Sequence, residues 1–173
     1  EDIHQVQSSQ YYEQPPQLFW NCGPESRTEF LPLPEDNCGA SFVKRIVGRG
    51  AAYADIDGDG DLDVLIMASG RSPRLLRNEQ KLDRHWIRFK LQGTASNRSA
   101  IGALIKVETP SGTFERQVMP TRSYLSQVEL PVTIGLGNSD VVKSVTIRWP
   151  DGSVQTLEDV QLDRVYEIEQ PTN

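Results

Sequence analysis

Residues 55–63, Asp-Ile-Asp-Gly-Asp-Gly-Asp-Leu-Asp, decide the interpretation of this chain, because five aspartates stand within nine positions. Asp55, Asp57 and Asp59 occupy positions 1, 3 and 5 of a loop, and Gly60 at position 6 permits a sharp turn. Calcium takes about 6–8 oxygen ligands and therefore favours closely spaced carboxylates and carbonyls. The spacing predicts a Ca²⁺ site. Its predicted ligands are Asp55, Asp57, Asp59, Asp61 and Asp63.

The last two ligands separate this loop from an EF-hand. Asp61 would contribute its backbone carbonyl, and Asp63 would close the shell at the start of a strand. Position 12 is Ile66, where an EF-hand has glutamate. Magnesium suits the loop less well, because its octahedral shell usually retains waters. The alternatives are a solvated acidic turn, which the regular spacing disfavours, and a catalytic carboxylate pair, which the crowding disfavours.

Composition excludes two broad classes of protein. The chain has 173 residues, a net charge of −6 and a pI near 5.0, whereas a nucleic-acid-binding domain needs a clustered basic face. No apolar run approaches the roughly 20 residues of a membrane span. We therefore expect no nucleic-acid partner and no membrane span.

Two cysteines, Cys22 and Cys38, stand in a region without strong periodicity. The histidines, His4 and His85, are too remote in sequence to complete a Cys2His2 metal site. The cysteines therefore form either a disulfide, which would indicate an oxidising compartment, or two unpaired thiols. The sequence leaves both alternatives open.

The chain is predicted to have three parts. Residues 1–20 indicate an extended N-terminal arm, which is either a flexible tail or a segment that orders on another subunit. Residues 21–80 indicate a blade that contains the calcium loop, and residues 84–170 a separate β-domain. In the first 80 residues, short strands are predicted at residues 17–20, 42–47, 62–67 and 74–78.

The C-terminal half alternates between apolar and polar residues. Ile87, Phe89 and Leu91 share one face of its first predicted strand, and Arg88 and Lys90 share the other. Such strands, with no convincing helix between them, predict an antiparallel sandwich or barrel. The other predicted strands are residues 101–109, 113–119, 132–136, 142–149, 154–157 and 165–169.

The quoted residues resemble two known families. Residues 48–66, followed by Leu75-Leu-Arg-Asn78, resemble an FG-GAP/VCBS repeat, the calcium-loop blade of integrin-like β-propellers. A second set of motifs resembles the ASPIC/UnbV domain of the cartilage acidic protein-like family. These motifs are His85-Trp-Ile, Ser96-Asn-Arg-Ser-Ala-Ile-Gly-Ala103, Ser123-Tyr-Leu-Ser-Gln127, Gly135-Leu-Gly137 and Trp149-Pro-Asp-Gly152.

The resemblance implies an all-β fold, with part of a β-propeller followed by a sandwich-like domain. A propeller needs about 4–8 blades, and this chain holds material for one or two at most. The resemblance also implies a secreted, periplasmic or cell-surface protein whose five loop aspartates bind calcium. No enzymatic activity is attributed to the ASPIC/UnbV domain, so the resemblance implies architecture more firmly than function.

Two arginines are candidates for ligand binding. Arg98 and Arg122 would line an anion or glycan pocket, or else bond structurally to loop carbonyls. Ser123 and Ser126 lack the elbow motif of nucleophilic serines, so we expect no catalysis. The predicted function is a non-catalytic, extracytoplasmic, calcium-binding structural or adhesion module that serves a larger assembly of protein partners. The alternative is a carbohydrate-binding or hydrolytic component with an unrecognised site.

Overall fold

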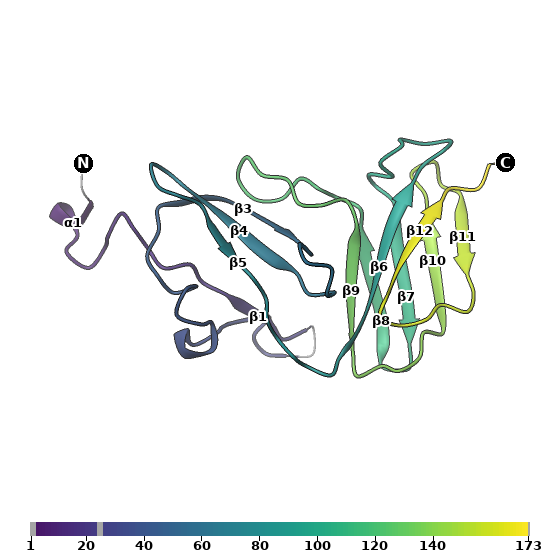
Figure 1. Cartoon of the computed structure of the whole chain (residues 1–173), viewed down its shortest axis with the longest axis horizontal. Helices are drawn as coiled ribbons and strands as arrows, with labels where there is room; N and C mark the ends of the chain where they lie inside the picture. The colour runs from purple at the N-terminus through teal and green to yellow at the C-terminus, as the bar shows by residue number, and fades with distance from the viewer. Residues whose placement is uncertain (1–2, 24–25, 173) are drawn as a thin grey trace. The chain divides into compact units, whose positions relative to one another are not determined.

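The computed structural model describes residues 3–23 and 26–172 and is almost entirely β (Figure 1). The first strands are β1 (Phe19–Asn21), β2 (Phe30–Pro32), β3 (Gly48–Ala54), β4 (Asp63–Ala68), β5 (Arg74–Leu76) and β6 (His85–Gln92). The later strands are β7 (Leu104–Thr109), β8 (Gly112–Gln117), β9 (Val132–Gly137), β10 (Ser144–Arg148), β11 (Val154–Leu157) and β12 (Arg164–Glu169). The predicted all-β class is confirmed.

Over residues 3–23 and 26–172, helical structure is limited to two short turns, α1 (Ile3–Val6) and the 3₁₀ turn η1 (Glu35–Asn37). In the part of the chain that the structure describes, neither of them has the length or the apolar character that crossing a membrane would take.

The chain divides into two units, and the division differs from the predicted boundary. The N-terminal unit comprises Glu1–Ala51 and Val64–Arg77. The C-terminal unit comprises Ala52–Asp63 and Asn78–Asn173. The aspartate loop therefore groups with the C-terminal strands, whereas the sequence pattern had assigned it to the blade.

The N-terminal unit has little apolar interior of its own. Its sheets have the strand orders β1-β2 and β3-β4-β5. Among the described residues of this unit, the buried apolar side chains are Ile46 and Val47. Large apolar side chains on and beside the β1–β2 hairpin are exposed. They are Leu18, Phe19, Trp20, Phe30 and Leu31.

The strand predicted at residues 42–47 is wrong, and β3 follows it instead. The guanidinium of Arg74 donates to the carbonyls of Phe42, Lys44 and Arg45, at 3.3, 2.6 and 3.3 Å. Neighbouring carbonyls that converge on one guanidinium do not alternate in direction as they would along a strand. The strand β3 was missed because Gly-Arg-Gly-Ala-Ala-Tyr-Ala lacks the β-branched residues that mark strands.

The N-terminal arm contacts its own chain. The hydroxyl of Tyr12 accepts a hydrogen bond from Arg49 at 2.7 Å, and the guanidinium of Arg45 lies 4.1 Å from the ring centroid of Tyr11. Gln14 pairs with Ile46 through backbone hydrogen bonds. Residues 11–14 therefore contact the same chain, whereas the two alternatives for the whole arm stay predictions.

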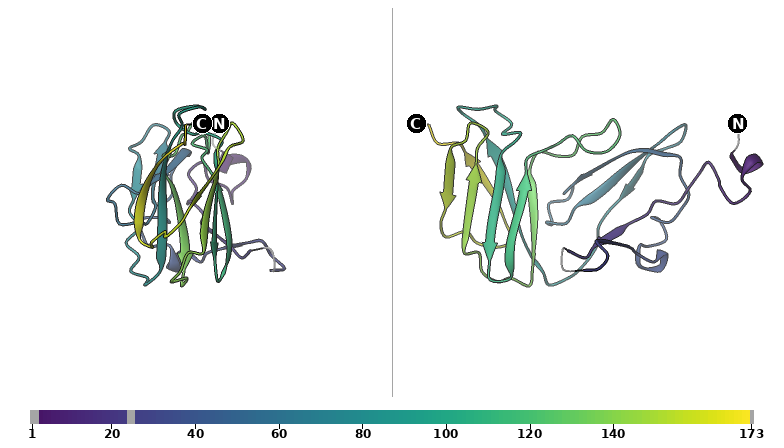
Figure 2. Two further views of the ribbon diagram at one scale, coloured as in Figure 1. Left: turned by 90° about the vertical axis from the view of Figure 1, so that its right-hand side faces the viewer. Right: turned by 180° about the vertical axis from the view of Figure 1, so that it is seen from behind.

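The C-terminal unit has two sheets, with strand orders β11-β10-β7-β8 and β12-β6-β9 (Figure 2). Both contribute to one hydrophobic cluster, because Ile87 and Phe89 of β6 and Ile105 and Val107 of β7 are all fully buried in it. This confirms the predicted apolar face. The expected antiparallel pairing is incomplete, since β12 pairs with β6 in parallel after the chain crosses over through residues 158–163.

Gln170 joins three loops of this unit and is 2% exposed. Its Oε1 accepts the backbone N–H groups of Thr94 and Ser96, at 3.1 and 3.2 Å. Its Nε2 donates to Asp151 Oδ2 at 2.7 Å. A buried amide with its bonds satisfied on both sides fixes the loops it joins.

Candidate metal site

The aspartate loop connects the end of β3 to the start of β4. Three of its carboxylates, those of Asp55, Asp57 and Asp59, each bring an oxygen within 4.8 Å of the other two. These are positions 1, 3 and 5 of the predicted site. The loop thus gathers the hard oxygen donors that calcium prefers.

Asp55 is held firmly within the loop. Its Oδ1 accepts the N–H of Gly58 at 2.8 Å, and its Oδ2 accepts the N–H of Gly60 at 3.3 Å. Only 3% of its side chain is exposed. The first predicted ligand is therefore oriented by the backbone of the loop that it serves.

Asp63 closes the loop and is 1% exposed. Its Oδ2 accepts the N–H of Ile56 at 3.1 Å, and its Oδ1 accepts the N–H of Asn78 at 2.8 Å. Because a carboxylate oxygen has two lone pairs, these bonds leave capacity for a metal. The role of Asp63 as a metal ligand stays a prediction. Its two hydrogen bonds to backbone N–H groups stabilise the loop.

The pKa of Asp61 reflects the negative charge that is crowded into the loop. Burial raises the pKa of its carboxyl, and the charges of Asp59, Asp55, Asp63 and Asp57 raise that pKa further. Its backbone N–H donates to Asp59 Oδ1 at 3.0 Å. The crowded negative charge opposes folding, and a divalent cation would offset it. In both donor chemistry and charge, the residues fit calcium.

Gly60 is required at its place for two reasons. Its φ of +95° lies in the region that side chains rarely adopt, and a Cβ there would overlap the ring of Trp86. The turn at position 6 is thus pressed directly against β6. This contact explains the glycine more fully than the loop pattern did.

Two charged residues that contact the loop were not predicted from the sequence. Arg88, on β6, is 6% exposed, and its guanidinium lies 3.2 Å from Asp55 Oδ2. Glu129, which precedes β9, forms an ion pair with the same guanidinium. Alternation places Arg88 and Lys90 on the same face of the strand, and it cannot tell a buried arginine from an exposed lysine.

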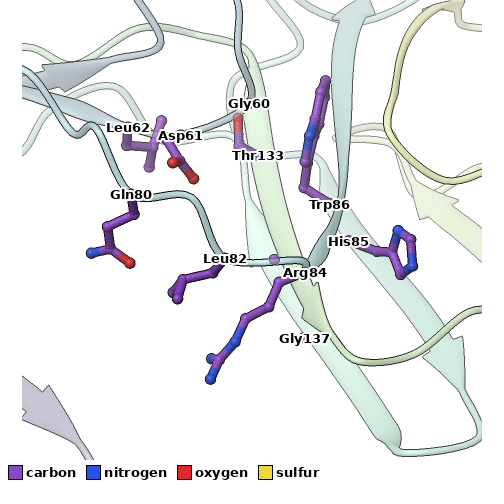
Figure 3. Close-up of a pocket in the computed structure, with 11 residues that line it drawn as sticks. Gly60, Asp61, Leu62, Gln80, Leu82, Arg84, His85, Trp86, Thr133 and Gly137 are labelled. Atoms are coloured by element: carbon purple, nitrogen blue, oxygen red, sulfur yellow. The ribbon is translucent and has the colours of Figure 1, made fainter.

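A cavity of about 400 Å³ lies beside the loop within the C-terminal unit. Figure 3 shows Asp61 of the loop, Gln80 and Arg84 of the segment before β6, and Trp86 and Thr133 of the strands. An aromatic ring among amide, guanidinium and hydroxyl groups suits a small polar ligand better than an apolar one.

The arginine candidates lie apart. Arg122 lines a different cavity of about 400 Å³, and its Nε is buried without a hydrogen-bond partner among the described residues. Arg98 is exposed, and it is not among the described residues that line this cavity. The structure does not bring the two arginines together in one cavity.

Cys22 and Cys38 are free thiols in the structure, and both are partly exposed. The Sγ of Cys22 lies 3.8 Å from the carbonyl oxygen of Trp20, and that of Cys38 lies 3.4 Å from the carbonyl oxygen of Pro34. Of the two alternatives that the sequence left open, the structure contains the unpaired one.

Comparison with known proteins agrees with the C-terminal part of this description. Cartilage acidic protein 1 of Mus musculus and that of Homo sapiens are each 32% identical over 148 residues, which is 81% of this chain and 22% of the relative. The Xenopus tropicalis protein is 32% identical over 131 residues, or 72% of this chain and 20% of the relative. The chain thus spans about a fifth of the length of these relatives. Residues 93–173 match the model of the ASPIC and UnbV family.

Proposed function

We propose that this chain is a non-catalytic, extracytoplasmic module in which calcium holds the loop at residues 55–63. The observation that carries the proposal is the approach of three carboxylates, from Asp55, Asp57 and Asp59, to within 4.8 Å of one another. Bound calcium would supply the positive charge that the aspartate loop lacks. The similarity to cartilage acidic protein 1 supports the extracellular placement.

The architecture that we infer is a calcium-bearing blade of the FG-GAP/VCBS type followed by a β-sandwich. Support for the sandwich comes from the two sheets of the C-terminal unit, whose buried residues form one cluster. Support for the blade comes from the three-stranded order β3-β4-β5, which leaves β3 and β5 as edges.

The proposed role is structural, within a larger assembly of proteins. Exposed apolar side chains on the β1–β2 hairpin support it, among them Phe19, Trp20 and Phe30, each at least half exposed. Apolar patches of this kind mark protein interaction sites more often than free surface. No enzymatic step is proposed, because the proposal assigns the carboxylates of the loop to a structural cation.

Thermal unfolding in excess chelator, in millimolar calcium and in millimolar magnesium tests the calcium proposal. At about 100-fold above the dissociation constant, a ligand of the native state stabilises it by about 2.7 kcal/mol, which for a chain of this size corresponds to about 5–10 °C in Tm. Asp57→Ala should abolish the calcium shift. Asp140→Ala, which removes an exposed carboxylate elsewhere, should retain it. A wild-type Tm that is the same in calcium and in chelator would refute the proposal.

Carbohydrate binding is the second candidate, and the cavity beside Trp86 favours it. Sugars stack on aromatic rings and accept hydrogen bonds from amide and guanidinium groups, which Gln80 and Arg84 supply here. A glycan array with the calcium-loaded chain would detect such binding. Arg84→Ala, a change at an exposed position, should then weaken it, and an array without signal would remove this candidate.

A further inference from the structure

Arg88 links the aspartate loop to the C-terminal sheets through a buried cluster of charges. Its Nη1 donates to Asp55 Oδ2 at 3.2 Å and to Thr133 Oγ1 at 2.9 Å. Its Nη2 donates to Glu129 Oε2. The side chains of Arg88, Asp55 and Glu129 are 7%, 3% and 15% exposed, so water screens these charges little.

Glu129 also holds the backbone of the loop. Its Oε1 accepts the N–H of Asp55 at 3.2 Å, and its own N–H points to the carbonyl of Tyr53 at 3.5 Å. Position 1 of the predicted site is therefore fixed twice from the C-terminal unit. Arg88 holds its carboxylate, and Glu129 holds its peptide group.

The positive charge of Arg88 and the negative charge of Glu129 act in opposite directions on a cation bound at Asp55. A guanidinium so close to Asp55 would repel calcium and compete for the carboxylate oxygen. The carboxylate of Glu129 is paired with the same guanidinium and cancels its charge. Asp55 then retains its full negative charge for the metal while keeping the orientation that Arg88 imposes.

The neighbouring lysine shows that this arrangement is specific to Arg88. Lys90 lies two residues further along β6 and pairs with Glu167, but these side chains are 50% and 76% exposed. An exposed pair contributes little, whereas removing one member of a buried pair leaves an uncompensated charge.

We propose that Arg88 and Glu129 form a charge-balanced clamp on position 1 of the calcium loop, so that the balance between their two charges sets the calcium affinity of the loop. The clamp rests on the proposed calcium function. Both residues are positioning residues, since they act on the metal through Asp55. The domain and its loop would then gain stability together when calcium binds.

Titration calorimetry of the whole chain with Ca²⁺ tests the clamp. Glu129→Gln keeps the shape of the side chain but leaves Arg88 unbalanced, and it should weaken calcium binding about tenfold. The double variant Arg88→Gln/Glu129→Gln removes both charges. Its calcium affinity should recover to within about threefold of the wild-type affinity, because a neutral pair can replace a buried ion pair at little cost. Glu108→Gln, which removes an exposed carboxylate paired with Lys106, should match wild type.

The outcomes separate the clamp from the calcium function on which it rests. Circular dichroism first establishes that each variant is folded at the titration temperature. Unchanged affinity in Glu129→Gln would overturn the clamp while leaving calcium binding intact. A double variant that binds as weakly as Glu129→Gln would also overturn it, because a purely structural role predicts no rescue. A folded wild-type chain that binds no Ca²⁺ would refute the calcium function, and the clamp with it.

Discussion

The two units of this chain differ in what lies inside them. Among the described residues of the C-terminal unit, twelve buried residues from both sheets and the segments beside their strands form one hydrophobic cluster. In the described part of the N-terminal unit, only Ile46 and Val47 are buried apolar residues, and Phe19 and Trp20 are at least half exposed. Regular strands alone therefore do not make a stable unit, since burial of apolar surface supplies most of the stabilisation. In the N-terminal unit, large apolar side chains such as Phe19 and Trp20 on the strands remain exposed to solvent.

Removing one phenylalanine from each unit is the strongest way to test this contrast. Phe89 is fully buried, and Phe89→Ala should lower the free energy of unfolding by about 3–5 kcal/mol. Phe19 is 50% exposed, and Phe19→Ala should change it by less than about 0.5 kcal/mol. Urea denaturation followed by circular dichroism measures both. Equal losses would show that the N-terminal unit has a core of its own.

A pair of glycines sharpens the contrast at a smaller scale. In Gly60→Ala, the new side chain must adopt a φ of +95° and would overlap the ring of Trp86. This change in the C-terminal unit should lower the free energy of unfolding by about 2 kcal/mol. In Gly39→Ala of the N-terminal unit, the alanine must adopt a φ of +78°, but its Cβ would have no atom within 4 Å. Only the backbone strain should then lower the free energy of unfolding, by about 1 kcal/mol. Both are measured by urea denaturation in excess chelator, so that metal affinity does not contribute. A Gly39→Ala cost as large as that of Gly60→Ala would contradict the close contact at Trp86.

The smallest expected effect is that of pH on a half-exposed pair. Burial raises the pKa of Asp163, but hydrogen bonds from His85 Nδ1 at 2.7 Å and from the N–H of Trp86 outweigh it, so its pKa lies below 3.8. A folded-state pKa below the unfolded value contributes stability above about pH 3.8, and this is lost as the pH falls through the folded value. Because the side chains are 38% and 45% exposed, the contribution is small.

Asp163→Asn should therefore lower Tm by about 1–2 °C at pH 6 and not at all near pH 2. Scanning calorimetry of both proteins across this range checks the sign. Glu13→Gln, which removes the partner of Arg71 in the N-terminal unit, serves as the control and should leave Tm unchanged at either pH. A difference that persisted at pH 2 would mean that the carboxyl does not act through its charge.

Alternation predicted the C-terminal strands well because each of them has one face in a core. Ile87 and Phe89 lie where the period of two places them. The same rule failed at β3, whose glycines and alanines carry no apolar signal, and at Arg88, whose burial depends on residues far away in sequence. The spacing of the aspartates predicted the approach of Asp55, Asp57 and Asp59, because carboxylates in one short loop need no tertiary contact to meet. Asp61 and Asp63 are not in this cluster, and their roles as ligands stay predictions.

Residues whose partners are distant could not have been found from the sequence. Glu129 precedes an ordinary strand, yet it pairs with a guanidinium 41 residues away. Gln170 lies beyond the last strand, yet it receives hydrogen bonds from a loop 74 to 76 residues earlier. Nothing local distinguishes either residue from a solvated neighbour. Their roles arise from the topology of the sheets.

The parallel pairing of β12 with β6 also joins strands that are far apart in the sequence. Residues 85–92 are synthesised before the five strands β7 to β11, and their partner at residues 164–169 is synthesised after them. Until then one edge of β6 has unsatisfied backbone groups, beside side chains that belong in the interior. A chain that stops after β11 would keep that edge open and offer it to other chains. Pairing with β12 thus removes an open strand edge from the unit.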